Sequence, residues 1–392
     1  VLWALRMRIF ISEYVCSGAW PNAESPASLA REGRAMLLAL LSDVAQIPGV
    51  AVCTTWDARL GEFGSRVEPA KGINPVSLGG DPASIDCTIV RSPRDESAVF
   101  RRLAAECDAT YVIAPELDDL LTQRVQAVLD AGGRSLNASP ASIAACSDKW
   151  ETFRRLSAAG IPTVPTARFV PGEPAPFEFP IVLKPRFGAG SQDTFLIHNV
   201  DQFHAAATRF ASKLRATSIQ QSAVSGQQDP RSAKVEAIVQ PYVPGRALSV
   251  AAVFRSDGTL RELWPLGEQR LSADGWFTYL GGQMPLSLDA VRSFEISILK
   301  SEMLRIAACF LGLRGYVGCD LILPETNDTP PLIIDINPRL TTSYLGYRAL
   351  AQTNLVSRIL WPDQDRPPLE WGDDGVVFDA DGAVVRSPAG RG

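Results

Sequence analysis

The chain has 392 residues, of which 46% are hydrophobic and 21% charged, a composition typical of a folded globular protein. Its length predicts two or three domains, since a domain usually holds roughly 100–200 residues. The formal net charge of −5 leaves no basic excess for nucleic acid, and the longest apolar runs, such as 36–41, are far shorter than the roughly 20 residues that cross a bilayer. We therefore expect neither a nucleic acid partner nor a membrane partner.

Residues 7–140 alternate between strand-like and helix-like segments. The expected strands are 8–12, 50–54, 85–90 and 111–114, and the expected helices are 29–41, 97–107 and 117–131. This alternation predicts a parallel sheet with covering helices, in which ligands bind at the carboxyl ends of the strands. Glu13, Tyr14, Gly18 and Glu116 follow such ends and are candidates for a substrate pocket. A role in shaping turns is the alternative, and it is the one that each residue taken singly favours.

From residue 141 onward the pattern changes to an α+β arrangement. The expected helices are 141–146, one that ends at Gly160, 200–211 and 289–311, and the expected strands include 235–240, 248–254, 260–266, 315–323 and 332–336. We predict an N-terminal α/β domain over 7–140, a domain of two subdomains over 141–350, and a C-terminal extension over 351–392 with a small hairpin.

Residues 268–285 are rich in glycine and aromatic residues, and we expect them to form a long loop. Trp276, Phe277 and Tyr279, followed by Gly281 and Gly282, indicate a substrate cover with glycine hinges. A packed aromatic cluster is the alternative.

Cysteine and histidine usage narrows the possible chemistry. The seven cysteines are scattered without a Cys-x-x-Cys pair, which is typical of a reducing cytoplasm. The two histidines, His198 and His204, are too few for a His-rich zinc site, and we expect both on a surface turn and helix rather than in catalysis.

The segment 180–191 indicates a nucleotide cradle. Its apolar strand delivers Lys184 beside a turn, in which Gly188 and Gly190 let backbone N–H groups approach a polyphosphate. Ser191 adds a hydroxyl donor, and Lys184 supplies a cation for the α- and β-phosphates. The segment is neither a Walker A loop nor a dinucleotide-binding fingerprint, because their glycine spacings are missing. Taken alone, it leaves an ordinary glycine turn equally open.

The segments 318–323 and 332–339 indicate a metal site. Asp320 and Asp335 fall in two strands with a short connection, so we expect them side by side on an antiparallel hairpin. Adjacent carboxylates repel, and a divalent cation such as Mg²⁺ between them would relieve the repulsion. Asn337 adds an oxygen on the face of Asp335, and Arg339 can neutralise a phosphate or carboxylate. The alternative, a polar surface strand, is disfavoured because Ile and Leu fill the other positions.

Together these segments resemble the ATP-grasp superfamily over residues 140–350. The motifs stand in its order: Lys149, Lys184, the 188–191 loop, the 240–243 segment, Asp320 and the 335–339 segment. The resemblance implies two α+β subdomains that clamp ATP, preceded by a parallel α/β domain. The alternation of residues 7–140 indicates that preceding domain independently.

The resemblance also implies roles for individual positions. The residues around ATP would be Lys149, Lys184, Gly188, Ala189, Gly190, Ser191, Gln240, Tyr242 and Val243. The ligands of Mg²⁺ (or Mn²⁺) would be Asp320, Asp335 and Asn337. Arg339 and Lys184 would be catalytic, with Arg339 steadying the transferred phosphoryl group. Two departures stand out: Asp335 replaces the usual Glu, and 245–249 lacks the usual acidic ribose contact.

Within the superfamily, residues 8–15 with Gly18, 269–270, 279–285 and 337–344 resemble the tyramine-glutamate ligase group, which joins glutamate to an aromatic amine on the route to methanofuran. The resemblance implies a ligase that uses ATP and Mg²⁺ to form an amide from a small-molecule carboxylate and an amine through an acyl phosphate. A small-molecule kinase and a non-catalytic ATP-binding module stay open as alternatives. The sequence leaves the acid, the amine and the oligomeric state open, with a homodimer among the alternatives.

Overall fold

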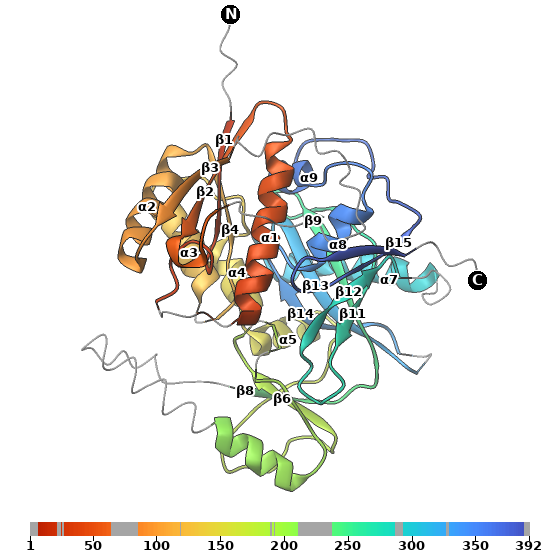
Figure 1. The fold of residues 1–392 in the computed structure, drawn as a ribbon. Helices are drawn as coiled ribbons and strands as arrows, with labels where there is room; N and C mark the ends of the chain where they lie inside the picture. Colours follow the sequence, from red (N-terminus) through yellow and green to blue (C-terminus); the bar gives the residue numbers. More distant parts are fainter. Residues whose placement is uncertain are drawn as a thin grey trace, which may run out of the picture.

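The computed structural model describes residues 7–21, 25, 27–63, 85–117, 119–188, 190–191, 193–210, 237–286, 293–326 and 329–387. These residues form three sheets, of which one is parallel and two are antiparallel (Figure 1). None of the helices in these ranges is both long enough and apolar enough to span a membrane.

The N-terminal sheet is parallel, with strand order β3-β2-β1-β4. Its strands are β1 (Met7–Glu13), β2 (Val50–Asp57), β3 (Ile85–Val90) and β4 (Ala109–Ile113), and its helices are α1 (Ala27–Ala45), α2 (Pro93–Glu106) and α3 (Leu120–Asp130). The expected parallel α/β fold of this part is confirmed. Strands β1, β2 and β4 are mostly buried, as parallel sheets require, whereas the edge strand β3 is partly exposed.

Helix α1 lies between the N-terminal sheet and the rest of the molecule (Figure 1). Its buried residues, among them Leu29, Gly33, Met36 and Leu40, recur at helical spacing. Gly33 is required by a close approach, because a Cβ there would stand 2.6 Å from the Cδ of Glu13. The helix can therefore pack directly over the end of β1.

Asp43, on the last turns of α1, joins this helix to α8 (Ser343–Leu350). Its carboxylate accepts hydrogen bonds from Tyr344 Oη at 2.6 Å and from Arg348 Nε and Nη2 at 2.9 and 2.7 Å. We expect Asp43→Asn to lower the free energy of unfolding by about 2 kcal/mol, because it removes a buried charge-assisted pair. Denaturant unfolding checks this, with Asp130→Asn, at an exposed position at the end of α3, as the control. A midpoint for Asp43→Asn equal to that of wild type would contradict the prediction.

The large sheet has eight strands in the order β14-β13-β9-β11-β12-β15-β16, with β10 beside β9. Its strands are β9 (Gly245–Phe254), β10 (Leu260–Leu263), β11 (Gly267–Leu271), β12 (Tyr279–Met284), β13 (Gly315–Pro324), β14 (Leu332–Asn337), β15 (Gly375–Phe378) and β16 (Val384–Ser387). Helices α7 (Ser293–Cys309), α8 and α9 (Val356–Leu360) pack on it. The expected C-terminal hairpin is confirmed, and β15 pairs with β12, so the hairpin extends this sheet. The domain limits stay predictions.

Residues 268–285 are not the long loop that we expected. They form the β11–β12 hairpin, in which Glu268 pairs with Gln283 and Gln269 with Gly282. Gly281 and Gly282 serve close packing rather than hinging, since a Cβ on Gly281 would lie 2.1 Å from the carbonyl oxygen of Phe378. Because glycine has a low strand propensity, the local sequence does not predict strand β12, which its pairing with β15 stabilises.

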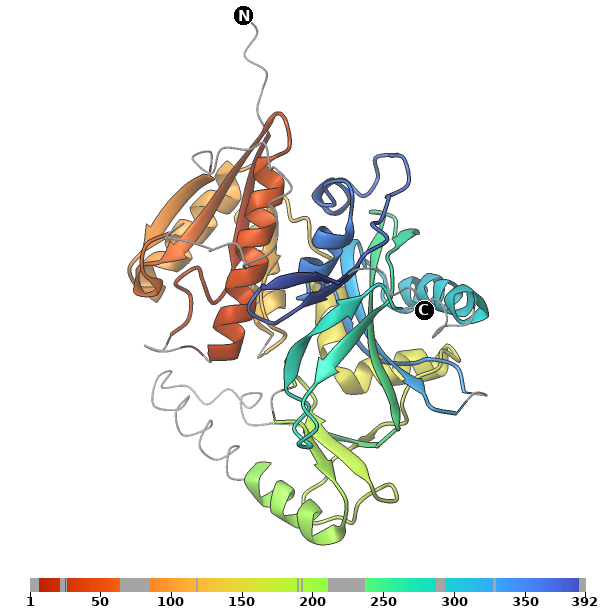
Figure 2. The ribbon, with the colours of Figure 1, turned by 45° about the vertical axis from the view of Figure 1, so that its right-hand side comes forward.

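The small sheet has the order β5-β8-β6-β7 and lies at the opposite end of the molecule from the start of β1 (Figure 2). Its strands are β5 (Ala167–Arg168), β6 (Ile181–Pro185), β7 (Phe195–Ile197) and β8 (Ala237–Pro241). Residues 200–210 form a helix whose Phe203 and Phe210 pack on this sheet. Helices α4 (Pro140–Ser147) and α5 (Lys149–Ala158) precede it in the chain, and Gly160, with φ 63°, ends the latter.

Candidate active site

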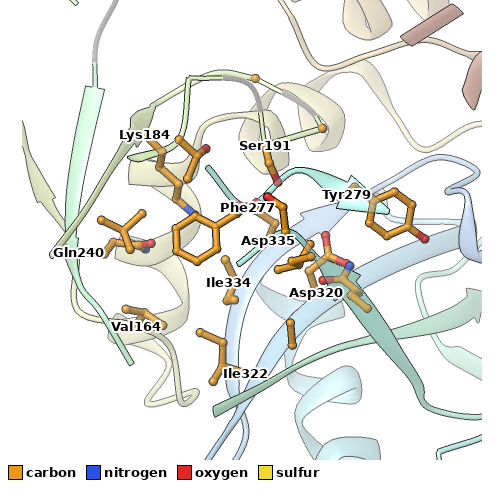
Figure 3. Close-up of a pocket in the computed structure, with 18 of the residues that line it drawn as sticks. Val164, Lys184, Ser191, Gln240, Phe277, Tyr279, Asp320, Ile322, Ile334 and Asp335 are labelled. Carbon is orange, nitrogen blue, oxygen red and sulfur yellow. The ribbon is translucent and has the colours of Figure 1, made fainter. Parts of the chain in front are cut away.

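A cavity of about 630 Å³ opens between the small sheet and the large sheet. Figure 3 shows Lys184 and Gln240 on the small-sheet side, facing Asp320 and Asp335 on the large-sheet side. The predicted site residues that line this one cavity are Lys149, Lys184, Gly188, Gly190, Ser191, Gln240, Tyr242, Val243, Asp320, Asp335, Asn337 and Arg339. Ala189 lies outside the described residues. The exposed His198 and His204 take no part in the lining.

One end of the cavity is apolar. Its lining includes Val164, Val182, Leu196, Phe277, Ile322 and Ile334. The Tyr242 and Phe277 rings lie with their centroids 6.3 Å apart, and the Tyr242 N–H donates to the Pro180 carbonyl at 3.0 Å. The Gln240 side chain donates to Thr166 Oγ1 at 2.8 Å, which fixes the strand at the cavity wall. An apolar slot beside a strand end suits a flat aromatic base.

Lys184 is a buried cation on β6, with 7% of its surface exposed. Because strand side chains alternate, Val182 and Lys184 face the cavity while Ile181 and Leu183 enter the core. Burial lowers the pKa of Lys184, an effect that nearby Asp335 opposes. Among the residues that the structure describes, none makes a hydrogen bond or ion pair with its ammonium group. Such a group is ready to receive an anion.

Lys149 begins α5 and lies beside the glycine turn. Its Nζ is 3.2 Å from Asp335 Oδ1 and donates to the Gly188 carbonyl at 3.1 Å. Asp148 caps α5 by accepting from the Trp150 and Glu151 N–H groups, and it also binds Arg186 at 2.7 and 2.5 Å. These contacts tie the start of α5 to the turn after β6.

The glycine turn holds an unusual backbone. Gly190 has φ 68°, and the next residue, Ser191, has φ 57°, a value that non-glycine residues seldom adopt. Both line the cavity. Strained backbone of this kind is found at ligand-binding turns more often than elsewhere, and here it is consistent with a phosphate cradle.

Asp320 and Asp335 are paired across β13 and β14, as the sequence predicted. Burial and the Asp335 charge raise the pKa of Asp320 to about 6. Burial also acts to raise the pKa of Asp335, but Lys149 and Lys184 outweigh it, so the net shift is downward. Asp320 accepts hydrogen bonds from Gln269 Nε2 at 2.7 Å and from Asn337 Nδ2 at 2.9 Å.

The donor set fits Mg²⁺. No cluster of three or more His, Cys, Asp or Glu side chains suited to a metal occurs in the described ranges. Mg²⁺ needs fewer protein ligands, since it usually keeps waters and takes phosphate oxygens beside one or two carboxylates. A cation between Asp320 and Asp335 would also remove the repulsion that raises the pKa of Asp320. Asn337 donates its hydrogen bond to Asp320 from Nδ2, so its Oδ1 is a separate atom that could ligate the cation.

Arg339 is fixed by Glu116 from the N-terminal sheet's side of the molecule. Its Nε and Nη2 donate to the two Glu116 carboxylate oxygens at 2.8 and 2.6 Å. Arg339 lines the cavity and Glu116 does not, so the part of Glu116 is to hold Arg339 in place. Glu13 accepts from the Cys16 N–H at 2.7 Å and Gly18 has φ 93°, so these two shape the turn after β1.

The sequence reasoning missed several lining residues. They include Glu32 and Met36 of α1, the Arg246–Glu268 ion pair, Thr341 and Thr342. Burial raises the pKa of Glu32 to about 7, while Arg339 and Arg31 act to lower it. Glu32 is the one glutamate of α1, and a glutamate on an amphipathic helix usually lies on the solvent face, so the sequence alone does not mark it as a cavity residue. The Arg246–Glu268 ion pair was not predictable either, because only the pairing of β9 with β11 brings these two residues together.

Comparison with known proteins identifies the family to which this architecture belongs. Residues 146–343, half of the chain, match the ATP-grasp domain, and residues 50–143 match the pre ATP-grasp 3 domain. The chain belongs to the ATP-grasp family. The parallel α/β sheet followed by two antiparallel sheets is the expected arrangement, and this part of the sequence interpretation is confirmed.

This ATP-grasp protein is also similar to two tyramine–L-glutamate ligases. The one from Methanocaldococcus fervens is 31% identical over 111 residues, which is 28% of this chain and 33% of the relative. The one from Methanocaldococcus jannaschii is 29% identical over 111 residues, or 28% and 32% of the two chains. The matched stretch therefore spans about a third of the length of these relatives.

Among solved structures, an ATP-grasp superfamily protein from Archaeoglobus fulgidus has a TM-score of 0.61 at 19% identity, covering 95% of this chain and 92% of its own. The L-amino acid ligase of Bacillus licheniformis has a TM-score of 0.63 at 13% identity, with 95% and 79% covered. The biotin carboxylase domain of Hydrogenobacter thermophilus 2-oxoglutarate carboxylase, in complex with MgADP, has a TM-score of 0.64 at 12% identity, with 94% and 73% covered. At these identities the likeness shows the ATP-grasp fold alone.

Proposed function

We propose that this ATP-grasp protein is a ligase that uses Mg²⁺-ATP to join a small-molecule carboxylate to an amine. The observation that carries the proposal is the arrangement across one cavity of the buried Lys184 ammonium group and the Asp320–Asp335 pair. A cationic wall facing a carboxylate pair is what a nucleoside triphosphate and its divalent cation need. Relatives named as ligases support the same reaction class.

The residues divide the work by position. The apolar end and the 240–243 segment would hold the adenine, and Lys149, Lys184 and the 188–191 turn would hold the phosphates. Asp320, Asp335 and Asn337 would hold Mg²⁺, which supplies charge neutralisation between phosphate oxygens when bound. Arg339, kept rigid by Glu116, would face the γ-phosphate and the acid. Catalysis is then mainly positioning and electrostatic stabilisation.

Two displacements complete the proposed reaction. A carboxylate oxygen of the acid attacks the γ-phosphorus, the bond to the β–γ bridging oxygen breaks, and ADP leaves. The amine nitrogen then attacks the acyl carbon of the acyl phosphate, the carbon–oxygen bond breaks, and inorganic phosphate leaves. The nitrogen loses one proton, and an amide results. The cavity must exclude water in between, because an acyl phosphate hydrolyses.

The test is ADP release from Mg²⁺-ATP with the twenty amino acids, each alone and each with an amine. L-Glutamate and tyramine are the first pair, since the relatives carry those substrates in their names. We expect ADP release that requires both an acid and an amine, with one amide formed per ADP. ADP release with a stable phosphorylated acceptor and no amine would replace the ligase by a kinase. ATP binding without ADP release would replace it by a binding module.

A further inference from the structure

One carboxylate in the cavity has no role in the scheme above. Glu32 lines it from α1, together with Met36, whereas the proposed nucleotide and metal residues come from the two antiparallel sheets and α5. Its electrostatic neighbours include Arg339 and Tyr279, which line the same cavity. Glu32 therefore marks the end of the cavity at which Arg339 and the N-terminal part of the chain meet.

The other acidic lining residues are engaged. Glu268 binds Arg246, Asp335 binds Lys149, and Asp320 accepts from two amide groups. In contrast, Glu32 makes neither a hydrogen bond nor an ion pair with any residue in the described ranges. A carboxylate of this kind, partly buried and unengaged, is suited to a positively charged or proton-donating ligand.

The position of Glu32 is set by contacts on both sides of α1. Behind it, Gly33 lets the helix lie against Glu13 at the end of β1. Farther along the same face, Asp43 is anchored to Tyr344 and Arg348 of α8. Glu32 and Asp43 are about three helical turns apart, so they point in nearly the same direction. Glu32 is thus held toward α8 and the cavity.

The charges around Glu32 favour a proton acceptor. Arg339, which lines the same cavity, acts electrostatically on Glu32, and so do Arg31 and Asp381, which pair with each other at 2.6 Å. Burial outweighs the two arginines and brings the pKa of Glu32 to about 7, so the group exchanges protons near neutrality. A general base is most effective when its pKa lies near the working pH.

Resting on the proposed ligase function, we propose that Glu32 binds the amine substrate as its ammonium ion and accepts the proton that the nitrogen must lose before it attacks the acyl phosphate. The second proton, which the nitrogen loses as the amide forms, goes to the departing phosphate, which leaves as hydrogen phosphate. Both Glu32 and Asp320 act electrostatically on Arg339, and all three line the same cavity. The acid would thus be activated beside Arg339, next to the amine that Glu32 holds.

The experiment separates the two half-reactions with hydroxylamine, which is neutral near neutral pH and traps acyl phosphates as hydroxamates. Wild type, Glu32→Gln, Glu32→Asp and the control Glu106→Gln, on the exposed face of α2, are compared in two assays. The first is hydroxamate formation across the amino acid panel. The second is amide formation with tyramine or whichever panel amine the wild type accepts.

We expect Glu32→Gln to lower kcat/KM for the amine by about 10²–10⁴-fold and to leave hydroxamate formation within about twofold of wild type. Glu32→Asp, which keeps the charge, should recover part of the amine activity, and Glu106→Gln should match wild type in both assays. If the glutamine variant does not fold, Glu32→Asp provides the test instead. We then expect it to raise the KM for the amine and to leave hydroxamate formation unchanged.

The possible failures are distinct. No hydroxamate and no amide from the wild type would overturn the ligase function, and the role of Glu32 with it. Hydroxamate formation by the wild type with unchanged amide formation in Glu32→Gln would overturn the role of Glu32 alone. Equal loss of both products in folded Glu32→Gln would also overturn it, because the residue would then serve acid activation.

Discussion

Asp335→Asn is expected to abolish turnover while leaving the fold intact. The amide has nearly the size of the carboxylate and keeps an oxygen toward Lys149, whose Nζ lies 3.2 Å away. The change removes one of two charges that would hold Mg²⁺, and charge stabilisation by a metal is worth several kcal/mol. We therefore expect turnover to fall by about 10³-fold or more. It also removes the like charge that raises the pKa of Asp320, so the pKa of Asp320 should fall.

The measurement combines ADP release at saturating Mg²⁺-ATP with thermal unfolding of the same preparation. Asp130→Asn, the same chemical change at an exposed position on α3, is the matched control and should keep wild-type values in both. Turnover within a few-fold of wild type in Asp335→Asn would remove Asp335 from the metal site. A large loss of thermal stability would instead make the paired aspartates structural.

The sequence predicts the parts of the site that lie on single strands or across short connections. Asp320 and Asp335 are adjacent because only a short connection separates β13 from β14. Their pairing can therefore be predicted from a short stretch of sequence. Lys184 follows from one apolar strand with one basic residue. In both cases the period-two alternation of a strand places the polar side chain on the face opposite the core.

Contacts between distant segments are not predictable in this way. Glu116 follows β4 and Arg339 follows β14, and only the packing of two sheets brings the guanidinium and carboxylate together. The β11–β12 hairpin was missed because Gly281 and Gly282 weaken its local strand signal, while Phe378, much later in the chain, provides the reason for both glycines. Glu32 is likewise distinguished only by the docking of α1. These features depend on tertiary contacts that one sequence does not reveal.

Lys184→Met is expected to weaken ATP binding without destabilising the free protein. The folded state lowers the pKa of Lys184, so its charged form at pH 7 costs stability, and that cost decreases as the pH rises through the lowered pKa. Methionine of similar length removes this burial cost, and the unfolding temperature without ligand should stay equal or rise. The same substitution removes charge-assisted hydrogen bonds to phosphate, worth about 1.5–3 kcal/mol each, so the Kd for ATP should rise by about 10–100-fold.

The readout is the shift in unfolding temperature that Mg²⁺-ATP produces. At a ligand concentration of about 100 Kd, binding stabilises a protein by about 2.7 kcal/mol, and a hundredfold weaker Kd reduces this to about 0.4 kcal/mol. The Lys184→Met shift should therefore nearly vanish, while Lys300→Met, at an exposed position on α7, should show the wild-type shift. A full ATP shift in Lys184→Met would show that this ammonium does not meet the phosphates. A free protein that unfolds at a much lower temperature would show that Lys184 is retained for its attraction to Asp335 rather than for the nucleotide.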